Sequence, residues 1–187
     1  MTGFLGSVEA TAEERSESRP GDDIVVPADV TMDRAFTVPG PPERVFPWIR
    51  QLGKQRAGWY LPRSVERLLP PARRATREVE PRWQTLRVGD VVPDYGGAHE
   101  TFTTTVLDPP HTLVYTSLRG RATVSWSIVL RPVEPGSGAP SATRVLLRLR
   151  MGPIQRRWLA YTAGEALDLV TIAGMAAGLR ERLAAER

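Results

Sequence analysis

The sequence predicts an α+β domain in which a curved antiparallel sheet wraps around a long C-terminal helix and an apolar pocket. Residues 123–130 and 144–151 alternate apolar with mainly polar side chains, which is typical of strands that bury one face. Short turns join the strand segments, and this indicates antiparallel neighbours. Residues 155–185 are predicted to form one helix with two apolar faces, so this helix should be buried.

The N-terminal residues are expected to lie outside the folded domain. Residues 1–23 are rich in Ser, Thr, Glu, Arg and Gly and have little apolar periodicity, which predicts a flexible tail. A first strand is predicted over residues 33–38, and the proline-rich run at 39–42 ends it because no central strand accommodates such a run. The predicted single domain therefore spans residues 24–187.

Two short helices are predicted after the first strand. Pro42 is well placed at a helix start, Pro47 limits regular helix to one side of itself, and Gly53 ends the helix. A second helix should begin near Pro62. The inner face of that second helix is predicted to consist of Val65, Leu68 and Leu69.

The middle of the chain changes to a period of two. Strands are predicted over residues 99–107 and 112–118, followed by the two alternating segments described above. The segment from 134 to 142 is rich in Pro, Gly and Ser and is predicted to be a loop. Consecutive strands with short connections predict an antiparallel meander.

Composition excludes several classes of site. The chain of 187 residues suits one domain with a sizeable core. It contains no cysteine, which excludes a disulfide framework, a thiolate nucleophile and a cysteine-ligated zinc site, and which fits a reducing cytoplasm. The net charge is +4, but the arginines are scattered among 21 acidic residues, so we expect a solvated surface and no nucleic-acid partner.

No targeting or membrane segment is expected. The first residues include Glu9 and no apolar run, unlike a signal peptide. The most apolar late stretch, residues 166–179, is too short to span a bilayer and contains Asp168. The sequence leaves the oligomeric state open.

Several short motifs occur in an order that resembles a known superfamily. The motifs lie at Pro20–Asp23, Asp33–Val38, Pro41–Gly53, Arg56–Tyr60, Val88–Asp90, Asp108–Val114, Ser125–Ser127 and Thr143–Val145. Together they resemble the SRPBCC superfamily, which includes START lipid-binding domains, plant pathogenesis-related allergens and polyketide cyclase/dehydrase-like proteins. The likeness is to a bacterial branch of this superfamily. It implies the helix-grip fold, with two short helices after the first strand.

The helix-grip fold implies a pocket between the concave face of the sheet and the long helix. Its apolar walls are then expected to come from two neighbouring strands and from the helix. The expected residues are Trp126, Ile128, Val145, Leu147, Leu167 and Val170. The alternative is that these side chains simply fill the core, because a close-packed interior needs such residues in any case.

Arg56, Trp59 and Tyr60 form the most informative cluster in the sequence. A planar guanidinium can hold a carboxylate or an enolate oxygen, and the aromatic rings can stack on a flat ligand. The alternative is a surface arginine beside two core aromatics. Both interpretations stay open from the sequence.

His99 is a candidate general base at the mouth of a predicted strand. Its neighbour Glu100 should point to the opposite face of a regular strand, so the two are not expected in one site. With only two histidines and no cysteine, no metal site is predicted, and no cofactor is expected.

Three functions are consistent with these features. The first is binding of a hydrophobic small molecule, lipid-like or polycyclic, in an internal cavity. The second, implied by the resemblance, is a polyketide cyclase/dehydrase-like enzyme, whose candidate residues are Arg56, Tyr60, His99 and Tyr115. The third is a regulatory or partner-binding module that uses the arginine-rich segment 63–77, for which a solvated face is the alternative.

Overall fold

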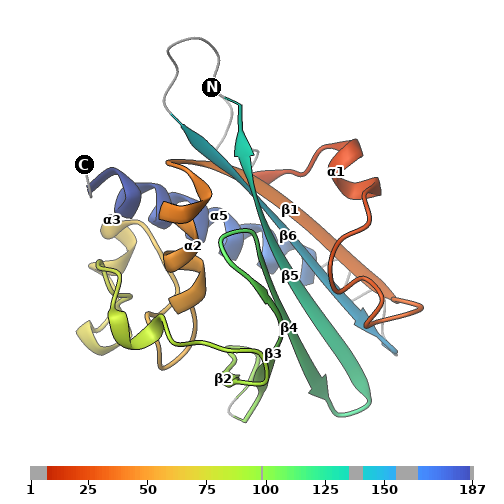
Figure 1. Ribbon diagram of the computed structural model, residues 1–187. Coiled ribbons are helices and arrows are strands. Elements are labelled where there is room, and N and C mark those ends of the chain that lie inside the picture. Colours follow the sequence, from red (N-terminus) through yellow and green to blue (C-terminus); the bar gives the residue numbers. More distant parts are fainter. Residues whose placement is uncertain (1–7, 98, 135–140, 155–163, 186–187) are drawn as a thin grey trace.

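The computed structural model describes residues 8–97, 99–134, 141–154 and 164–185. Its centre is a curved antiparallel sheet of six strands in the order β1-β6-β5-β4-β3-β2, with helix α5 against one face (Figure 1). The strands are β1 (Val30–Pro39), β2 (Val91–Pro93), β3 (Thr101–Asp108), β4 (Thr112–Arg119), β5 (Ala122–Val133) and β6 (Ala142–Gly152). The helices are α1 (Ala12–Ser16), α2 (Pro42–Gln51), α3 (Arg63–Glu66) and α5 (Glu165–Ala185), with 3₁₀ turns η2 (Pro71–Arg73) and η3 (Pro81–Trp83). The predicted α+β helix-grip architecture is confirmed.

The register of the sheet fixes which side chains share its concave face. Tyr115 on β4 lies opposite Trp126 on β5, Trp126 lies opposite Leu149 on β6, and Leu149 lies opposite Met32 on β1. Residues directly opposite each other in antiparallel strands point to the same side. This row therefore crosses the concave face, and Trp126, Leu149 and Met32 within it line the cavity described below.

Helix α2 departs from the prediction at Pro47. The helix runs through this proline without interruption from Pro42 to Gln51. A proline in a helix removes one backbone hydrogen bond, to the carbonyl four residues earlier. That residue is Glu43 in the exposed first turn, and the bond lost there is outweighed by burial of the apolar face. The buried apolar residues of the helix are Val45, Phe46, Trp48 and Ile49.

Helix α3 is oriented differently from the prediction. Val65 and Leu68, expected to point inward, are 41% and 85% exposed. The inward residue is Glu66, whose carboxylate accepts a 2.6 Å hydrogen bond from Arg182 of α5. Apolar spacing alone therefore predicted the wrong face, because a buried ion pair determines the orientation of this short helix.

Arg182 is fully enclosed between α5 and the segment that contains α3. Its five N–H groups donate to the Glu66 carboxylate and to four backbone carbonyls. The carbonyls belong to Leu61, Ala75, Thr76 and Gly178. The guanidinium also lies 4.6 Å from the centre of the Tyr60 ring. Burial would raise the pKa of Glu66, but hydrogen bonds from Arg182 and Arg77 outweigh it and the pKa is lowered.

Close backbone approach accompanies this ion pair. A Cβ atom at Gly178 would lie 2.6 Å from backbone atoms of Leu61, so only glycine allows α5 to come this close. From Ile172 to Leu183 most residues of α5 are buried, whereas Ala166, Leu167 and Val170 near its start are exposed. The predicted helix segment 155–163 lies outside the described residues. Within the described chain, no helix is both long enough and apolar enough to cross a bilayer.

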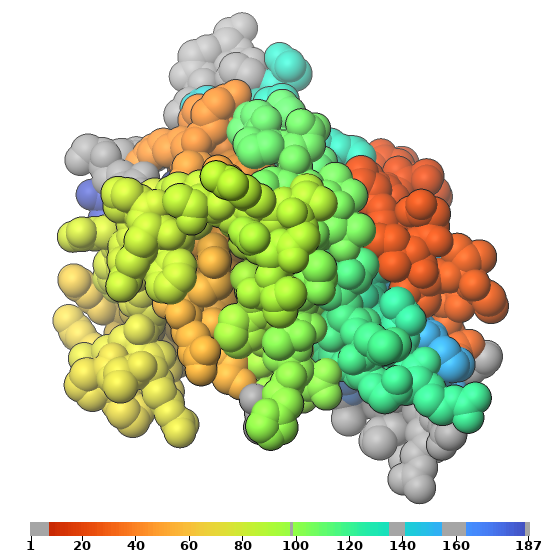
Figure 2. Space-filling view, turned by 60° about the horizontal axis from the view of Figure 1, so that its bottom comes forward, coloured from red at the N-terminus to blue at the C-terminus, as the bar shows by residue number. Residues whose placement is uncertain are grey.

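The N-terminal segment was expected to be flexible, yet residues 8–23 are packed against the sheet. Figure 1 shows α1 on the opposite side of the sheet from α2 and α5, and in Figure 2 the red N-terminal segment lies directly against the green strands. Val8 is fully buried, and the backbone of Glu9 pairs with Arg34 of β1. Residues 1–7 of the predicted tail are outside the described part of the chain.

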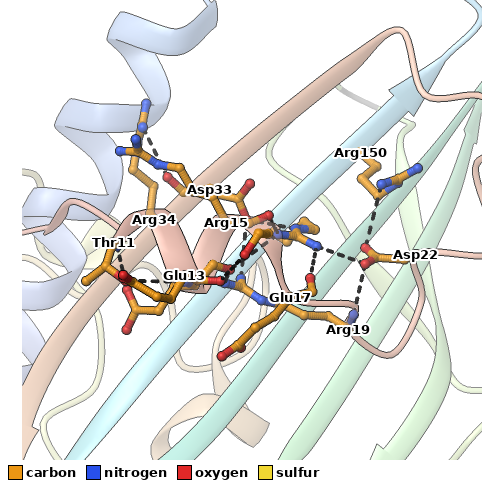
Figure 3. Close-up of polar contacts among 12 residues, drawn as sticks. Thr11, Glu13, Arg15, Glu17, Arg19, Asp22, Asp33, Arg34 and Arg150 are labelled. Carbon is orange, nitrogen blue, oxygen red and sulfur yellow. Dashed lines mark hydrogen bonds and ion pairs between the residues drawn. The ribbon is translucent and has the colours of Figure 1, made fainter.

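A network of arginines and carboxylates explains this packing (Figure 3). Arg148 projects from the convex face of β6 and uses all five N–H groups. Its acceptors are the carboxylates of Asp22 and Asp33 and the carbonyls of Glu14, Arg15 and Glu17. Arg144 adds two 2.8 Å hydrogen bonds to Glu14. The polar composition that suggested disorder is thus used to satisfy charges on the sheet, which no apolar periodicity reveals.

Replacement of Arg182 tests the contact between α5 and α3. We expect Arg182→Met to lower the free energy of unfolding by about 3 kcal/mol, because the Glu66 carboxylate and four carbonyls lose their donors in a buried site. Urea unfolding followed by tryptophan fluorescence measures this change. The control is Arg121→Met in the exposed β4–β5 turn, which should change stability by less than about 0.5 kcal/mol. Equal effects of the two substitutions would contradict a structural role for Arg182.

Replacement of Arg148 tests whether the arginine network holds the N-terminal segment. We expect Arg148→Met to raise amide hydrogen exchange in residues 9–22 at least about tenfold, since four hydrogen bonds to that segment are lost, while exchange in α5 stays unchanged. The control is Arg131→Met, which removes the half-exposed pair with Glu17 and should have little effect. Unchanged exchange in Arg148→Met would show that the segment is held by other contacts.

Candidate ligand cavity

A cavity of about 600 Å³ lies between the concave face of the sheet and the first turns of α5. The sheet contributes mainly apolar and aromatic side chains, and α5 closes the opposite side. The lining residues from the sheet and its preceding segments are Met32, Trp59, Asp94, Tyr95, Gly96, Phe102, Arg119, Trp126, Leu149 and Met151. The lining residues near α5 are Gly164, Leu167, Asp168, Thr171 and Ile172.

Five aromatic rings form one wall of the cavity and the layer behind it. Trp126 is at their centre, stacked on Trp59 and on Tyr115 with ring centres 6.1 Å apart in both cases. Phe102 lies 6.0 Å from Trp126, and Tyr95 meets Trp59 edge-on at 6.0 Å. Each ring packs against a neighbouring ring, so the wall is already formed.

The indole of Trp59 is tied to the opposite wall. Its Nε1 donates a 3.2 Å hydrogen bond to the carbonyl of Thr171 in α5. The Thr171 hydroxyl donates to the Leu167 carbonyl of the same helix, and does not enter a polar network with the sheet. Trp59 therefore bridges the two sides of the cavity and holds its width.

Two ion pairs interrupt the apolar lining. Arg119 donates to the carboxylate of Asp94 beside the aromatic wall. Asp168 on α5 lies with its Oδ2 2.9 Å from Nε of Arg34 on β1. Burial raises the pKa of the Asp168 carboxyl, although Arg34 opposes the shift. The charged groups that line the cavity are thus paired.

The structure brings some of the predicted ligand residues to the cavity and places others elsewhere. Trp59, Trp126 and Leu167 line it. Ile128, Val145 and Leu147 lie further along the same concave face and are almost completely buried in the core. Val170 is 55% exposed on α5 and is outside the lining. These four remain predictions as ligand contacts.

Arg56 and Tyr60 have structural partners. Arg56 donates to the carbonyls of Arg50 and Trp83 and lies 5.0 Å from the centre of the Trp83 ring. The Tyr60 hydroxyl donates a 2.8 Å hydrogen bond to the Trp48 carbonyl, and burial raises the pKa of this phenol. Neither side chain lines the cavity.

Tyr115 and His99 differ in environment. The Tyr115 ring stands behind Trp126, and its hydroxyl is buried without a hydrogen-bond partner in the described residues. Burial raises the pKa of Tyr115 to about 12. His99 is exposed just before β3 and does not line the cavity. Catalysis by any of the four candidates stays a prediction.

Sequence reasoning missed the polar pair Asp94 and Arg119. They are 25 positions apart, before β3 and at the end of β4, and only the sheet brings them together. The residues around Asp94 carried a weak signal, a Tyr-Gly-Gly run that needs close backbone contacts. No motif marked Arg119, because it resembles the other turn arginines of the chain.

Comparison with known proteins identifies the class of fold. A crystal structure of a Rhodobacter sphaeroides protein aligns with a TM-score of 0.52 and 16% identity over 87% of this chain and 97% of that chain. The chain thus shares the fold of that protein, with a curved antiparallel sheet against a long C-terminal helix. The Aha1 dimer from Colwellia psychrerythraea aligns with a TM-score of 0.45 and 12% identity over 81% of this chain and 98% of that chain.

A polyketide cyclase-like protein of Corynebacterium glutamicum has a TM-score of 0.38 and 14% identity over 86% of this chain and 90% of that chain. No family model matches the sequence, and no curated protein matches it. At these identities the likeness concerns the fold alone.

Two tyrosine variants test the contrast between a bonded and an unbonded buried hydroxyl. Tyr60→Phe should lower the free energy of unfolding by about 1 kcal/mol, because the Trp48 carbonyl loses its donor. Tyr115→Phe removes a hydroxyl without a protein partner and should leave stability unchanged or slightly higher. Urea unfolding of both variants measures these changes in the free energy of unfolding. An equal decrease for Tyr115→Phe and Tyr60→Phe would show that the Tyr115 hydroxyl has an acceptor in the folded protein.

The raised pKa of Tyr115 also predicts how the stability of the protein depends on pH. A phenol of ordinary pKa near 10 in the unfolded chain, raised to about 12 in the folded protein, binds its proton more tightly when folded. Below pH 10 the phenol is neutral in both states, and as the pH rises from 10 toward 12 the folded protein loses stability relative to the unfolded chain. Tyr115→Phe should therefore flatten the loss of stability over this range.

Proposed function

We propose that this protein binds a flat, hydrophobic small molecule in the cavity between the concave face of the sheet and α5. The observation that carries the proposal is the preformed wall of stacked rings beside about 600 Å³ of space. Ligand cavities of roughly 300 to 1,000 Å³ with apolar linings and a few polar groups are typical of small-molecule sites. A planar ligand could stack against Trp126 and Trp59 without rearrangement.

The cavity also has an apolar approach from solvent. Leu167 on α5 is 66% exposed, and Tyr95 at the aromatic wall is 53% exposed. Large apolar groups are usually exposed together only where something covers them. Their position at the cavity supports entry of a hydrophobic ligand at this edge.

The positions of the candidate catalytic residues favour binding over catalysis. None of Arg56, Tyr60, His99 and Tyr115 is among the described residues that line the cavity. Burial raises the pKa of the lining carboxyl of Asp168, but this group is paired with Arg34. The polyketide cyclase-like alternative would require a ligand position that brings other groups within reach.

A cavity-filling variant tests this function with an uncharged fluorescent probe, N-phenyl-1-naphthylamine. The wild-type protein should enhance the fluorescence of the probe with saturable, micromolar affinity. Leu149→Trp places an indole into the cavity from β6 and should weaken binding at least about tenfold, since the ligand loses its space. The control is Val88→Trp, on an exposed residue before β2, which should leave affinity unchanged.

Absence of saturable binding by the wild-type protein, or equal affinity in the two tryptophan variants, would contradict a ligand site in this cavity. Native mass spectrometry of freshly purified protein, with denaturing extraction, gives the natural ligand directly if it is retained.

A further inference from the structure

Arg119 has an incompletely bonded guanidinium and lines the cavity, whereas the other arginines with a buried, unpartnered Nε–H among the described residues lie outside its lining. Arg182 and Arg148 each donate five hydrogen bonds to protein acceptors. Arg119 has one acceptor among the described residues, the Asp94 carboxylate. Its Nε–H is buried and has no hydrogen-bond partner in the described part of the chain. Burial of an unsatisfied donor is unfavourable unless something else supplies the acceptor.

The position of Arg119 makes a ligand a suitable source of that acceptor. Arg119 lines the cavity, and its guanidinium lies 5.4 Å from the centre of the Phe102 ring. Gly96 packs closely against the ion pair of Asp94 and Arg119. A Cβ atom at this position would lie 2.8 Å from the Asp94 carboxylate and 2.9 Å from Arg119 Nη1. The guanidinium is therefore held between a ring and the backbone, beside the space that a ligand would fill.

The charge balance of the cavity indicates which acceptor fits. The charge of Arg119 is already compensated by Asp94, and that of Asp168 by Arg34. A carboxylate on the ligand would approach Asp94 as well as Arg119, and would bring an uncompensated charge into an apolar site. An uncharged carbonyl oxygen accepts a hydrogen bond from Arg119 without either penalty.

We infer that Arg119 is the specificity-determining residue of the cavity and selects flat, uncharged ligands that carry a carbonyl oxygen at one edge. Asp94 is the positioning residue, which holds the guanidinium and cancels its charge. This inference rests on the proposed ligand-binding function and adds the chemical class of the ligand.

Three naphthalene probes of similar size separate the possibilities: 2-acetonaphthone with a neutral carbonyl, 2-ethylnaphthalene with no acceptor, and 2-naphthoate with a negative charge. Each is titrated as a competitor of N-phenyl-1-naphthylamine on the full chain. Arg119→Met should lower the affinity for 2-acetonaphthone about tenfold, because the hydrogen bond from a charged donor to its carbonyl oxygen is lost. The affinity of 2-ethylnaphthalene should change less than about twofold, since its contacts are apolar.

A second variant reverses the selectivity instead of removing it. Asp94→Asn leaves Arg119 in the cavity as an uncompensated cation, so 2-naphthoate should bind about tenfold more tightly than to the wild-type protein. This gain of affinity cannot result from misfolding. It requires Arg119 to face the ligand and Asp94 to balance its charge.

The outcomes distinguish this inference from the proposed function. Equal weakening of the ketone and the hydrocarbon by Arg119→Met would show a purely structural role and overturn the inference while ligand binding stands. Stronger binding of 2-naphthoate than of 2-acetonaphthone to the wild-type protein would overturn the neutral ligand class. Failure of N-phenyl-1-naphthylamine to bind the wild-type protein would overturn both.

Discussion

The fully bonded guanidinium of Arg182 is the contact on which the geometry of the site depends. It joins the last turns of α5 to the segment around α3, at the place where Gly178 allows the helix backbone to meet Leu61. An arginine without exposed surface is stable there only because each N–H has an acceptor, since an unpaired buried charge would be strongly unfavourable. With this end of α5 fixed, its other end has a defined distance from the sheet. That distance is the width of the cavity.

The cavity lies where the packing of α5 on the sheet becomes less close. The described α5 residues that line it fall between Leu167 and Ile172, before the small, buried residues that let the helix approach its neighbours. Large rings of the sheet, centred on Trp126, face this part of the helix and keep it away. The hydrogen bond from Trp59 to the Thr171 carbonyl then bridges the remaining gap. Tight packing at one end of the helix and bulky rings at the other thus leave the space of the cavity between helix and sheet.

The sequence predicted the parts of this fold that depend on local periodicity. The strands β5 and β6 were confirmed, but the exposed face expected from their alternation was wrong, because Ser125, Ser127 and Arg148 on that face are buried as well. The predicted inner face of α3 was wrong, since the pairing of Glu66 with Arg182 is a tertiary contact over 116 positions. The packing of residues 8–23 on the sheet was not predicted for the same reason, as polar residues of this segment pair with strand arginines far along the chain. The Asp94–Arg119 pair was missed because neither residue belongs to a motif.

Arginine has two roles among the described residues of this protein, and position relative to the cavity distinguishes them. Arg148 and Arg182 are enclosed by acceptors of the chain itself, so they join segments and have no donor left for anything else. Arg119 is held by one carboxylate at the edge of a cavity and keeps a buried donor without a protein acceptor among the described residues. The other arginines with a buried, unpartnered Nε–H in the described chain, such as Arg50 and Arg56, lie outside the lining of this cavity. A guanidinium that is positioned and neutralised but incompletely bonded is instead suited to a partner from outside the chain, and the cavity beside it is where such a partner would bind.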